Sequence, residues 1–351
     1  MARRLIPIPA ALVALFVVLS LSLAGGAWAA HTTSAPRALP PPRTITLGMG
    51  YIPSVQFAPF YVADQRGYYR RAGLRVDFAY GGSSNQLELV GAGRVNFAIA
   101  DGTDALAAAA QGVPVTDVMT QYRRLPVAIF TLIRTGIRSV ANLRGKTIGV
   151  PGRYGSTYVG LLAALHAAGL RPDRDVTITP VGYNQAASVE GGKVDAAVDY
   201  SNNGPVILAR HGLRITTLQI GAMTNLVGPG VVAGRDLIAR DPRIVRAFVQ
   251  ATLQGMADTI RDPRAAFAIA RTAKGLPPLR GSDVGDQYAV LQSAIAVWHD
   301  AATRVHGLGY ADPAQWRVSA RTLQAIGQLP RTPAIDDALV TDRFSAGAPK
   351  L

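Results

Sequence analysis

LVGAGRVNFAIADGTDALAAAAQGVPV, residues 89–115, decides the fold, because residues 188–215 repeat its pattern as SVEGGKVDAAVDYSNNGPVILARHGLRI. In each copy a Gly-rich turn and one basic residue lead into a short apolar run, then a polar acidic corner, then a helix rich in Ala or Leu. Each copy therefore predicts a strand that feeds a helix. Neither copy can bury its own apolar strand, so each must belong to a separate α/β sheet covered by helices on both faces.

Two similar α/β lobes predict a cleft between them. In open parallel sheets, ligands bind outside the carboxyl ends of the strands. These ends are residues 101–103 in the first copy and 199–202 in the second. The candidate ligand-binding residues at these ends are Asp101, Thr103, Asp199, Tyr200 and Asn202.

The composition indicates a folded, two-domain protein. With 351 residues and 49% hydrophobic residues, the chain has enough apolar material for two cores. The net charge of +14 comes from scattered Arg residues. Since no basic run is interleaved with aromatic residues, nucleic-acid binding is not expected. Attraction to anionic lipid or to an acidic ligand stays open. The absence of Cys excludes disulfides and thiolate chemistry.

The N-terminus reads as a secretion signal. Arg3 and Arg4 precede an apolar stretch, and Ala27 and Ala29 form an A-x-A cleavage pattern, so residues 1–29 are predicted to be removed. The alternative is an uncleaved anchor, because the apolar stretch approaches the length of a membrane span. The protein is thus predicted to be periplasmic, or tethered to the outer face of the membrane. Residues 30–43 read as a Pro-rich linker.

The order of elements predicts a discontinuous first lobe. Residues 44–127 and 223–345 are expected to form it, and residues 128–222 the second lobe. Two crossings, near residues 126–130 and 223–232, would make a hinge. Asp-Pro pairs at 241–242 and 262–263 indicate helix starts, and these C-terminal helices are expected to pack on the first lobe.

Two loops offer groups for a ligand. In the loop after the first strand, Tyr51, Gln56 and Phe57 present flat apolar surfaces and hydrogen-bonding groups to a planar ligand, although Phe57 also has the spacing of a core residue. Residues 152–158, GRYGSTY, lie between a strand and a helix. Their backbone N–H groups, with the hydroxyls of Ser156 and Thr157, suit an anionic or carbonyl-rich ligand.

The remaining candidates each have a structural alternative. Asp199 is predicted either to accept hydrogen bonds from a ligand or to cap its own turn. Thr103 is expected to cap a helix. The further candidate residues are Tyr154, Tyr183, Asn184, Ser83 and Ser84, of which the two serines also suit a helix N-cap.

Signals for catalysis are weak. The five His residues have no metal-ligand spacing, and no G-x-S-x-G elbow or catalytic pair of carboxylates occurs. The sequence therefore predicts a protein that is not an enzyme, with no metal and no cofactor.

The motif order resembles the periplasmic solute-binding proteins of ABC importers, in the branch that handles thiamine pyrimidine precursors, alkanesulfonates and nitrate. The resemblance runs over residues 45–276 and rests on GYIPSVQFAPFYVADQRGYYRRAGL, LVGAGRVNFAIAD, SVANLRGKTIGVPG and KVDAAVDYSNN. It implies a type II-like two-lobed fold that closes on its ligand by hinge bending. It also implies membrane permease subunits as partners, a monomer, and no covalent chemistry.

The resemblance also limits the ligand. The aromatic-rich first loop is similar to those of pyrimidine and riboflavin binders, which favours a flat heteroaromatic vitamin or precursor; alkanesulfonates and other small anions are the alternative. Eukaryotic relatives are enzymes that build the thiamine pyrimidine, and they resemble one another in a Cys-rich motif that this chain lacks. A membrane-tethered sensor is a third reading.

Overall fold

The computed structural model describes residues 41–81 and 83–350, without the side chains of residues 83 and 84. The predicted signal and most of the predicted linker lie outside these residues. The chain from Pro42 onward forms one compact unit, and its first strand begins at Arg43. Among the described residues, no helix combines the length and the apolar character needed to cross a bilayer.

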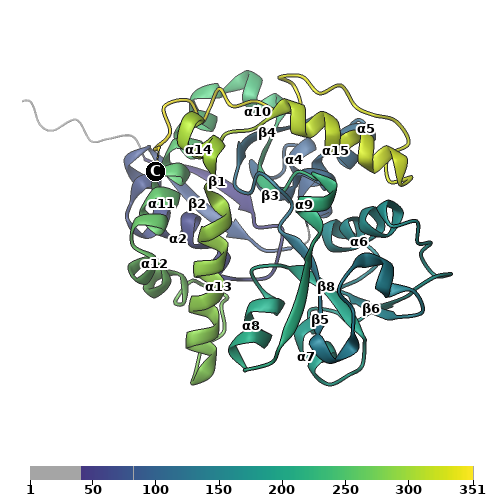
Figure 1. Cartoon of the computed structure of the whole chain (residues 1–351). Coiled ribbons are helices and arrows are strands. Elements are labelled where there is room, and N and C mark those ends of the chain that lie inside the picture. The colour runs from purple at the N-terminus through teal and green to yellow at the C-terminus, as the bar shows by residue number, and fades with distance from the viewer. Residues whose placement is uncertain (1–40, 82, 351) are drawn as a thin grey trace, which may run out of the picture. The chain divides into compact units, whose positions relative to one another are not determined.

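Two five-stranded sheets organise the unit, and each defines a lobe together with the helices packed on it (Figure 1). The first sheet has the order β2-β1-β3-β10-β4 and the second β7-β6-β8-β5-β9. The strands of the first sheet are β1 (Arg43–Gly48), β2 (Leu74–Ala79), β3 (Phe97–Asp101), β4 (Val115–Thr120) and β10 (Pro229–Gly234). Those of the second are β5 (Val127–Leu132), β6 (Thr147–Val150), β7 (Thr177–Pro180), β8 (Ala196–Tyr200) and β9 (Ile215–Gln219).

The repeated segments form the central strands of the two sheets. β3 is parallel to β1 and antiparallel to β10, and β8 is parallel to β6 and antiparallel to β5. Each sheet is therefore parallel on one side of the repeated strand and antiparallel on the other. The prediction of two separate α/β sheets is confirmed.

The chain crosses between the sheets twice. It passes from β4 to β5, and it returns from β9 to β10. The second predicted crossing, residues 223–232, begins within a helix, and only its last part is a strand. Helix α9 (Ile220–Thr224) occupies the beginning, and Asn225, with a φ of 53°, ends it before β10 starts at Pro229.

Helices cover both faces of the sheets. The first lobe carries η1 (Val55–Phe57), α2 (Ala58–Gln65), α3 (Tyr68–Arg71), α4 (Ser83–Gly91), α5 (Gly102–Ala110), α10 (Arg235–Arg240), α11 (Pro242–Arg261) and α12 (Pro263–Ala270). The second lobe carries η2 (Ile133–Thr135), η3 (Val140–Leu143), α6 (Gly155–Ala167), α7 (Gln185–Glu190) and α8 (Gly204–Arg210). The last helices are α13 (Ser282–Trp298), α14 (Ala301–His306) and α15 (Pro313–Ala325).

The two predicted Asp-Pro helix starts are confirmed. Asp241 accepts a hydrogen bond from the Ile244 N–H at the start of α11, and Asp262 accepts one from the Ala265 N–H at the start of α12. Each carboxylate satisfies an N–H group that the helix leaves unpaired. α11 packs so closely on α2 that position 255 requires glycine. A Cβ at Gly255 would lie only 2.2 Å from the carbonyl oxygen of Pro59.

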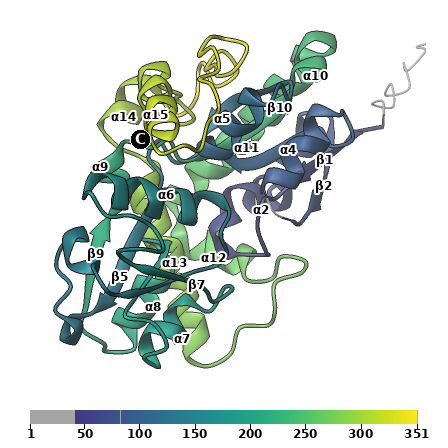
Figure 2. The same ribbon diagram turned by 90° about the vertical axis from the view of Figure 1, so that its right-hand side faces the viewer.

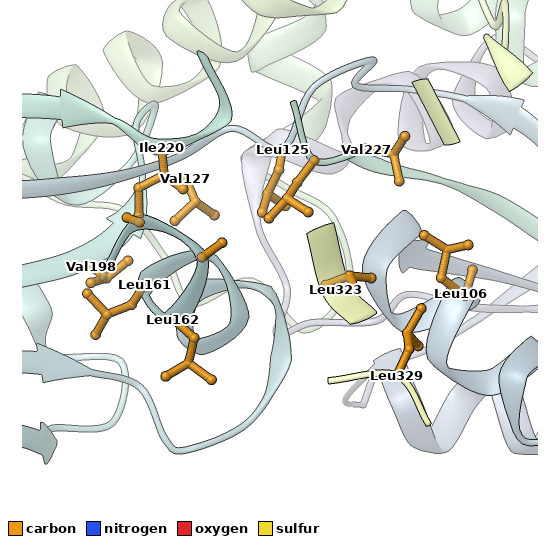
Figure 3. Close-up of a cluster of buried hydrophobic side chains, with 14 of the residues drawn as sticks. Leu106, Leu125, Val127, Leu161, Leu162, Val198, Ile220, Val227, Leu323 and Leu329 are labelled. Atoms are coloured by element: carbon orange, nitrogen blue, oxygen red, sulfur yellow. The ribbon is translucent and has the colours of Figure 1, made fainter. Parts of the chain in front are cut away.

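One apolar cluster continues from lobe to lobe where the chain crosses (Figure 3). Leu125 and Val127 come from the first crossing, and Ile220 and Val227 from the second. The cluster extends to Leu161, Leu162 and Val198 in the second lobe and to Leu106 in the first, and it takes in Leu323 of α15 and Leu329 beyond it. The crossings are therefore embedded in a packed apolar core.

The C-terminal helices were expected on the first lobe, but they contact both lobes. α13 packs on η1 and α12 of the first lobe and also lies along α8 of the second (Figures 1 and 2). At this contact, the buried Asp286 accepts a hydrogen bond from Arg210 Nε at 2.6 Å, and its other oxygen lies 3.0 Å from His211 Nε2. α15 contacts α5 and α6.

Strand β4, at the edge of the first sheet, contains a buried carboxylate. Residues 339–341 cover this edge, since the Asp117 N–H donates to Leu339 O and the Thr341 N–H to Asp117 O. The Asp117 side chain is 1% exposed, and its Oδ1 has no hydrogen-bond partner. Burial raises the pKa of Asp117 from 3.8 to about 7, although the nearby Thr120 and Met119 partly oppose the shift.

Asp117→Asn should remove a pH dependence of stability. The folded state holds the Asp117 proton more tightly than the unfolded chain does, so its stabilising contribution is present below pH 3.8 and is lost as the pH rises through about 7. The full effect on the free energy of unfolding is on the order of 4 kcal/mol. Urea unfolding between pH 4.5 and 8 (about the range over which the group titrates) measures it. If the free energies of unfolding of wild type and Asp117→Asn changed in parallel with pH, the prediction would be contradicted.

Candidate functional site

A cavity of about 320 Å³ lies between the lobes at the carboxyl ends of the repeated strands. The loop after β1, the end of β3 and the residues after β4 line it from the first lobe, and the start of α6, Tyr183, Gln185 and the end of β8 from the second. Ten sequence-predicted residues line this cavity: Tyr51, Gln56, Phe57, Asp101, Tyr154, Ser156, Thr157, Tyr183, Asp199 and Tyr200.

Other predicted residues lie elsewhere. Thr103 is inside the first turn of α5, which begins at Gly102, so its predicted role as the helix cap is wrong; Asp101 holds the N-cap position. Asn184 precedes α7 and lines a different cavity, together with Lys193. Asn202 is fully buried and does not line the main cavity. Ser83 and Ser84 open α4, but their side chains are outside the described part of the chain.

Aromatic side chains from the two lobes meet at the cavity. The rings of Tyr51 and Tyr183 are 5.0 Å apart and nearly perpendicular, at 88°. Tyr183 is 50% exposed and Tyr154 65% exposed, so these two form the rim. Phe57 both lines the cavity and belongs to the first-lobe core. Burial, with the nearby Asp199 charge adding to it, raises the pKa of Tyr51, which therefore keeps its hydroxyl proton.

Polar contacts also join the two lobes beside the cavity. The Tyr200 hydroxyl donates to Asp101 Oδ1 at 2.5 Å, and the Asn202 amide lies within 3.3 Å of both Gln56 Oε1 and the Tyr122 hydroxyl. Burial raises the pKa of Asp101, and hydrogen bonds from Tyr200 and Ser156 oppose that shift. The Oδ1 of Asn202 is buried without a partner. These contacts form a polar seam between the lobes.

Asp199 organises its own turn. Its Oδ1 accepts from the Tyr200 N–H at 2.7 Å, and its Oδ2 accepts from the Gly204 N–H and from Asn203 Nδ2, each at 3.0 Å. Of the two predicted roles of Asp199, the structure shows the local cap. Burial still raises the pKa of Asp199 from 3.8 to about 6, because three donors offset only part of the desolvation.

Sequence reasoning missed several lining residues. They are chiefly carboxamides and one tyrosine: Asn85, Gln121, Tyr122, Gln185 and Asn203. Gln121 and Tyr122 directly follow β4, so a polar pair after a buried strand was a usable signal. As far as the chain is described, no Lys, Arg or His lines this cavity, and no cluster of His, Asp or Glu is suited to a metal ion.

Comparison with known proteins shows to which family this chain belongs. The profile described as "NMT1/THI5 like" matches residues 54–266, more than half of the chain. The chain belongs to this family. It is 38% identical over 317 residues to the riboflavin-binding protein RibY of Chloroflexus aurantiacus, covering 90% of each chain. It is 27% identical over 242 residues to a 4-amino-5-hydroxymethyl-2-methylpyrimidine phosphate synthase of Legionella pneumophila, covering 67% of this chain and 75% of the relative.

Solved structures confirm the predicted fold. The periplasmic aliphatic sulphonate binding protein SsuA of Escherichia coli superposes with a TM-score of 0.65 at 17% identity, covering 85% of this chain and 97% of that one. At this identity the likeness concerns the fold alone, which is the two-lobed fold of periplasmic binding proteins. Within the NMT1/THI5-like family, the higher identity to a binding protein than to the synthase supports the prediction of a solute-binding role without catalysis.

Tyr200→Phe should loosen the contact between the lobes. The substitution removes the donor to the partly buried Asp101. Loss of a hydrogen bond to a shielded carboxylate costs about 1 to 3 kcal/mol of the free energy of unfolding. In small-angle scattering, the ligand-free variant should also have a larger radius of gyration than the wild type.

Tyr69→Phe is the matched control for this variant. Its hydroxyl makes a buried hydrogen bond to Thr252 at 2.8 Å within the first lobe. It should lose comparable stability in denaturant unfolding without any change in the radius of gyration. Equal radii of gyration for wild type and Tyr200→Phe would show that the Tyr200–Asp101 contact does not hold the lobes together.

Proposed function

We propose that this protein is the extracytoplasmic substrate-binding component of an ABC importer and that it captures a small planar heteroaromatic nutrient, a riboflavin-like vitamin or a thiamine pyrimidine precursor. The observation that carries the proposal is the cavity between the lobes, which is lined by the ring of Tyr51 from the first lobe and the ring of Tyr183 from the second. Flat aromatic walls with a few polar groups suit a planar ring. The printed function of the relative from Chloroflexus aurantiacus supports the same ligand class.

Capture would proceed by hinge bending. Residues 44–127 with 223–345 would move as one lobe and residues 128–222 as the other, about the two crossings. A ligand that touches both lobes stabilises only the closed arrangement, so binding shifts the population toward closure. The closed, loaded form would then be the one that the membrane permease subunits recognise.

The proposed cellular location rests on the predicted secretion signal, residues 1–29. We propose export across the inner membrane with cleavage after Ala29, giving a periplasmic monomer. The alternative is a protein that keeps residues 1–29 as a tether to the outer face of the membrane. Intact mass spectrometry of the protein from its native cell decides between them, since a mature chain that starts at Ala30 excludes the tether.

Alkanesulfonates or other small anions are the second candidate ligands. The start of α6 favours them, because Ser156 and Thr157 line the cavity at a helix N-terminus. No basic side chain accompanies this helix end among the described lining residues. The neutral heteroaromatic ligand is therefore the better fit.

A thermal-shift screen tests the proposed function. The mature protein would be incubated with riboflavin, thiamine, the hydroxymethylpyrimidine precursor, taurine, aliphatic sulfonates and nitrate. Ligand at about 100 times its dissociation constant adds about 2.7 kcal/mol, which raises the unfolding midpoint by roughly 5 °C for a chain of this size. A shift with sulfonates alone would establish the second candidate.

Tyr51→Ala should weaken binding of the planar ligand by roughly tenfold or more, because it removes a ring that faces the cavity and contacts Tyr183. Isothermal titration calorimetry measures this loss. Tyr51→Phe is the control, since it keeps the ring and removes only the hydroxyl, and it should bind within about threefold of the wild type. Equal losses in both variants would mean that the hydroxyl, and not the ring, holds the ligand.

A further inference from the structure

The charged groups of the cavity are carboxylates. In the described part of the chain, Asp101 and Asp199 are the only lining residues with ionisable acidic or basic side chains, apart from tyrosines. Asp101 comes from the first lobe and Asp199 from the second. A ligand held between the lobes thus faces a carboxylate on each side and no compensating cation.

Both carboxylates already occupy the positions in which a bound anion would be stabilised. Asp101 is the N-cap of α5, where negative charge interacts favourably with the helix dipole. Asp199 accepts the N–H of Gly204, the first residue of α8. Ser156, at the start of α6, lies near Asp101 and opposes the rise in its pKa. The chain's own carboxylates therefore use up much of the positive potential that the helix ends direct at the cavity.

The remaining polar lining groups are neutral. The carboxamides of Gln56, Gln121, Gln185, Asn85 and Asn203 each carry both donors and acceptors. Such groups pair with hydroxyls and with the N–H and C=O groups of a heterocycle. They do not neutralise an ionised phosphate.

We propose that this cavity selects the uncharged form of its heteroaromatic ligand and rejects the phosphate monoester of the same compound, with Asp101 and Asp199 as the residues that determine this specificity. The inference rests on the proposed function. Its physical basis is repulsion between a phosphate dianion and two carboxylates in a buried space, where water screens charges weakly. The protein would then discriminate between a free vitamin and its phosphorylated cofactor form.

The test is a titration of the mature wild-type protein with riboflavin and with flavin mononucleotide, followed by the quenching of flavin fluorescence. These probes share the ring system and differ by one phosphate. Riboflavin is expected to bind at least about 100-fold more tightly, which corresponds to about 2.7 kcal/mol. Affinities within about threefold of each other would overturn the inference and leave the proposed function intact.

Asp199→Asn and Asp101→Asn test the assignment of the residues. Each asparagine loses the charge and keeps one side-chain oxygen as an acceptor, so the preference for riboflavin should fall by about fivefold or more. Asp195→Asn is the matched control. Asp195 lies directly before β8, the strand that contains Asp199, but it accepts a hydrogen bond from the Thr147 N–H and does not line the cavity. An unchanged preference in both cavity variants, with native melting temperatures, would overturn the roles of these residues.

Absence of binding by either flavin would instead contradict riboflavin as the ligand. The same comparison with hydroxymethylpyrimidine and its phosphate would then decide the inference. Tighter binding of the free pyrimidine supports the selection against phosphate. Equal or tighter binding of the phosphate overturns it.

Discussion

The two lobes share one apolar core at their crossings, and this shared core holds both sheets in place. Leu125 and Val127 on one crossing, and Ile220 and Val227 on the other, are buried together with side chains of both sheets. Separating the lobes completely would expose this cluster to water, at a cost of about 25 cal/mol for each Å² of apolar surface. The lobes are therefore confined to rotation about a packed pivot, which keeps the carboxyl ends of β3 and β8 facing each other.

The polar seam borders this pivot, since Tyr200 packs against the same apolar cluster and pairs with Val127, but it has a different physical character. Tyr200 with Asp101, and Asn202 with Gln56 and Tyr122, join the lobes through directional bonds that break and re-form with small displacements. Because an unpaired buried donor or acceptor is costly, the seam favours either full contact or exposure of its groups to water. The apolar pivot thus sets where the lobes turn, and the seam defines the arrangement in which they meet.

Sequence reasoning succeeded where the signal was local. The repeat identified β3 and β8, and the Asp-Pro pairs located the starts of α11 and α12 from four residues. It also named most of the polar and aromatic residues of the cavity, because the ends of parallel strands share one edge of a sheet.

It failed where the answer depends on contacts between distant segments. Gln121 and Tyr122 reach the cavity because β10, more than a hundred residues later, pairs between β3 and β4 and positions the end of β4. Thr103 was assigned as a cap because threonine often has that role, but the helix begins one residue before it. The contact of α13 with α8 has no signature in either helix taken alone.

Helix α13 connects the wall of the cavity to an ion pair with the second lobe. Near its beginning, Asp286 holds Arg210 and His211 of the second lobe, and at its end the ring of Trp298 lies 6.1 Å from that of Tyr122 on the cavity wall. In the proposed hinge bending, opening the lobes would require this carboxylate to release both partners, and each loss would add to the activation barrier for opening. The residence time of a captured ligand would then be governed in part by three side chains that do not line the cavity.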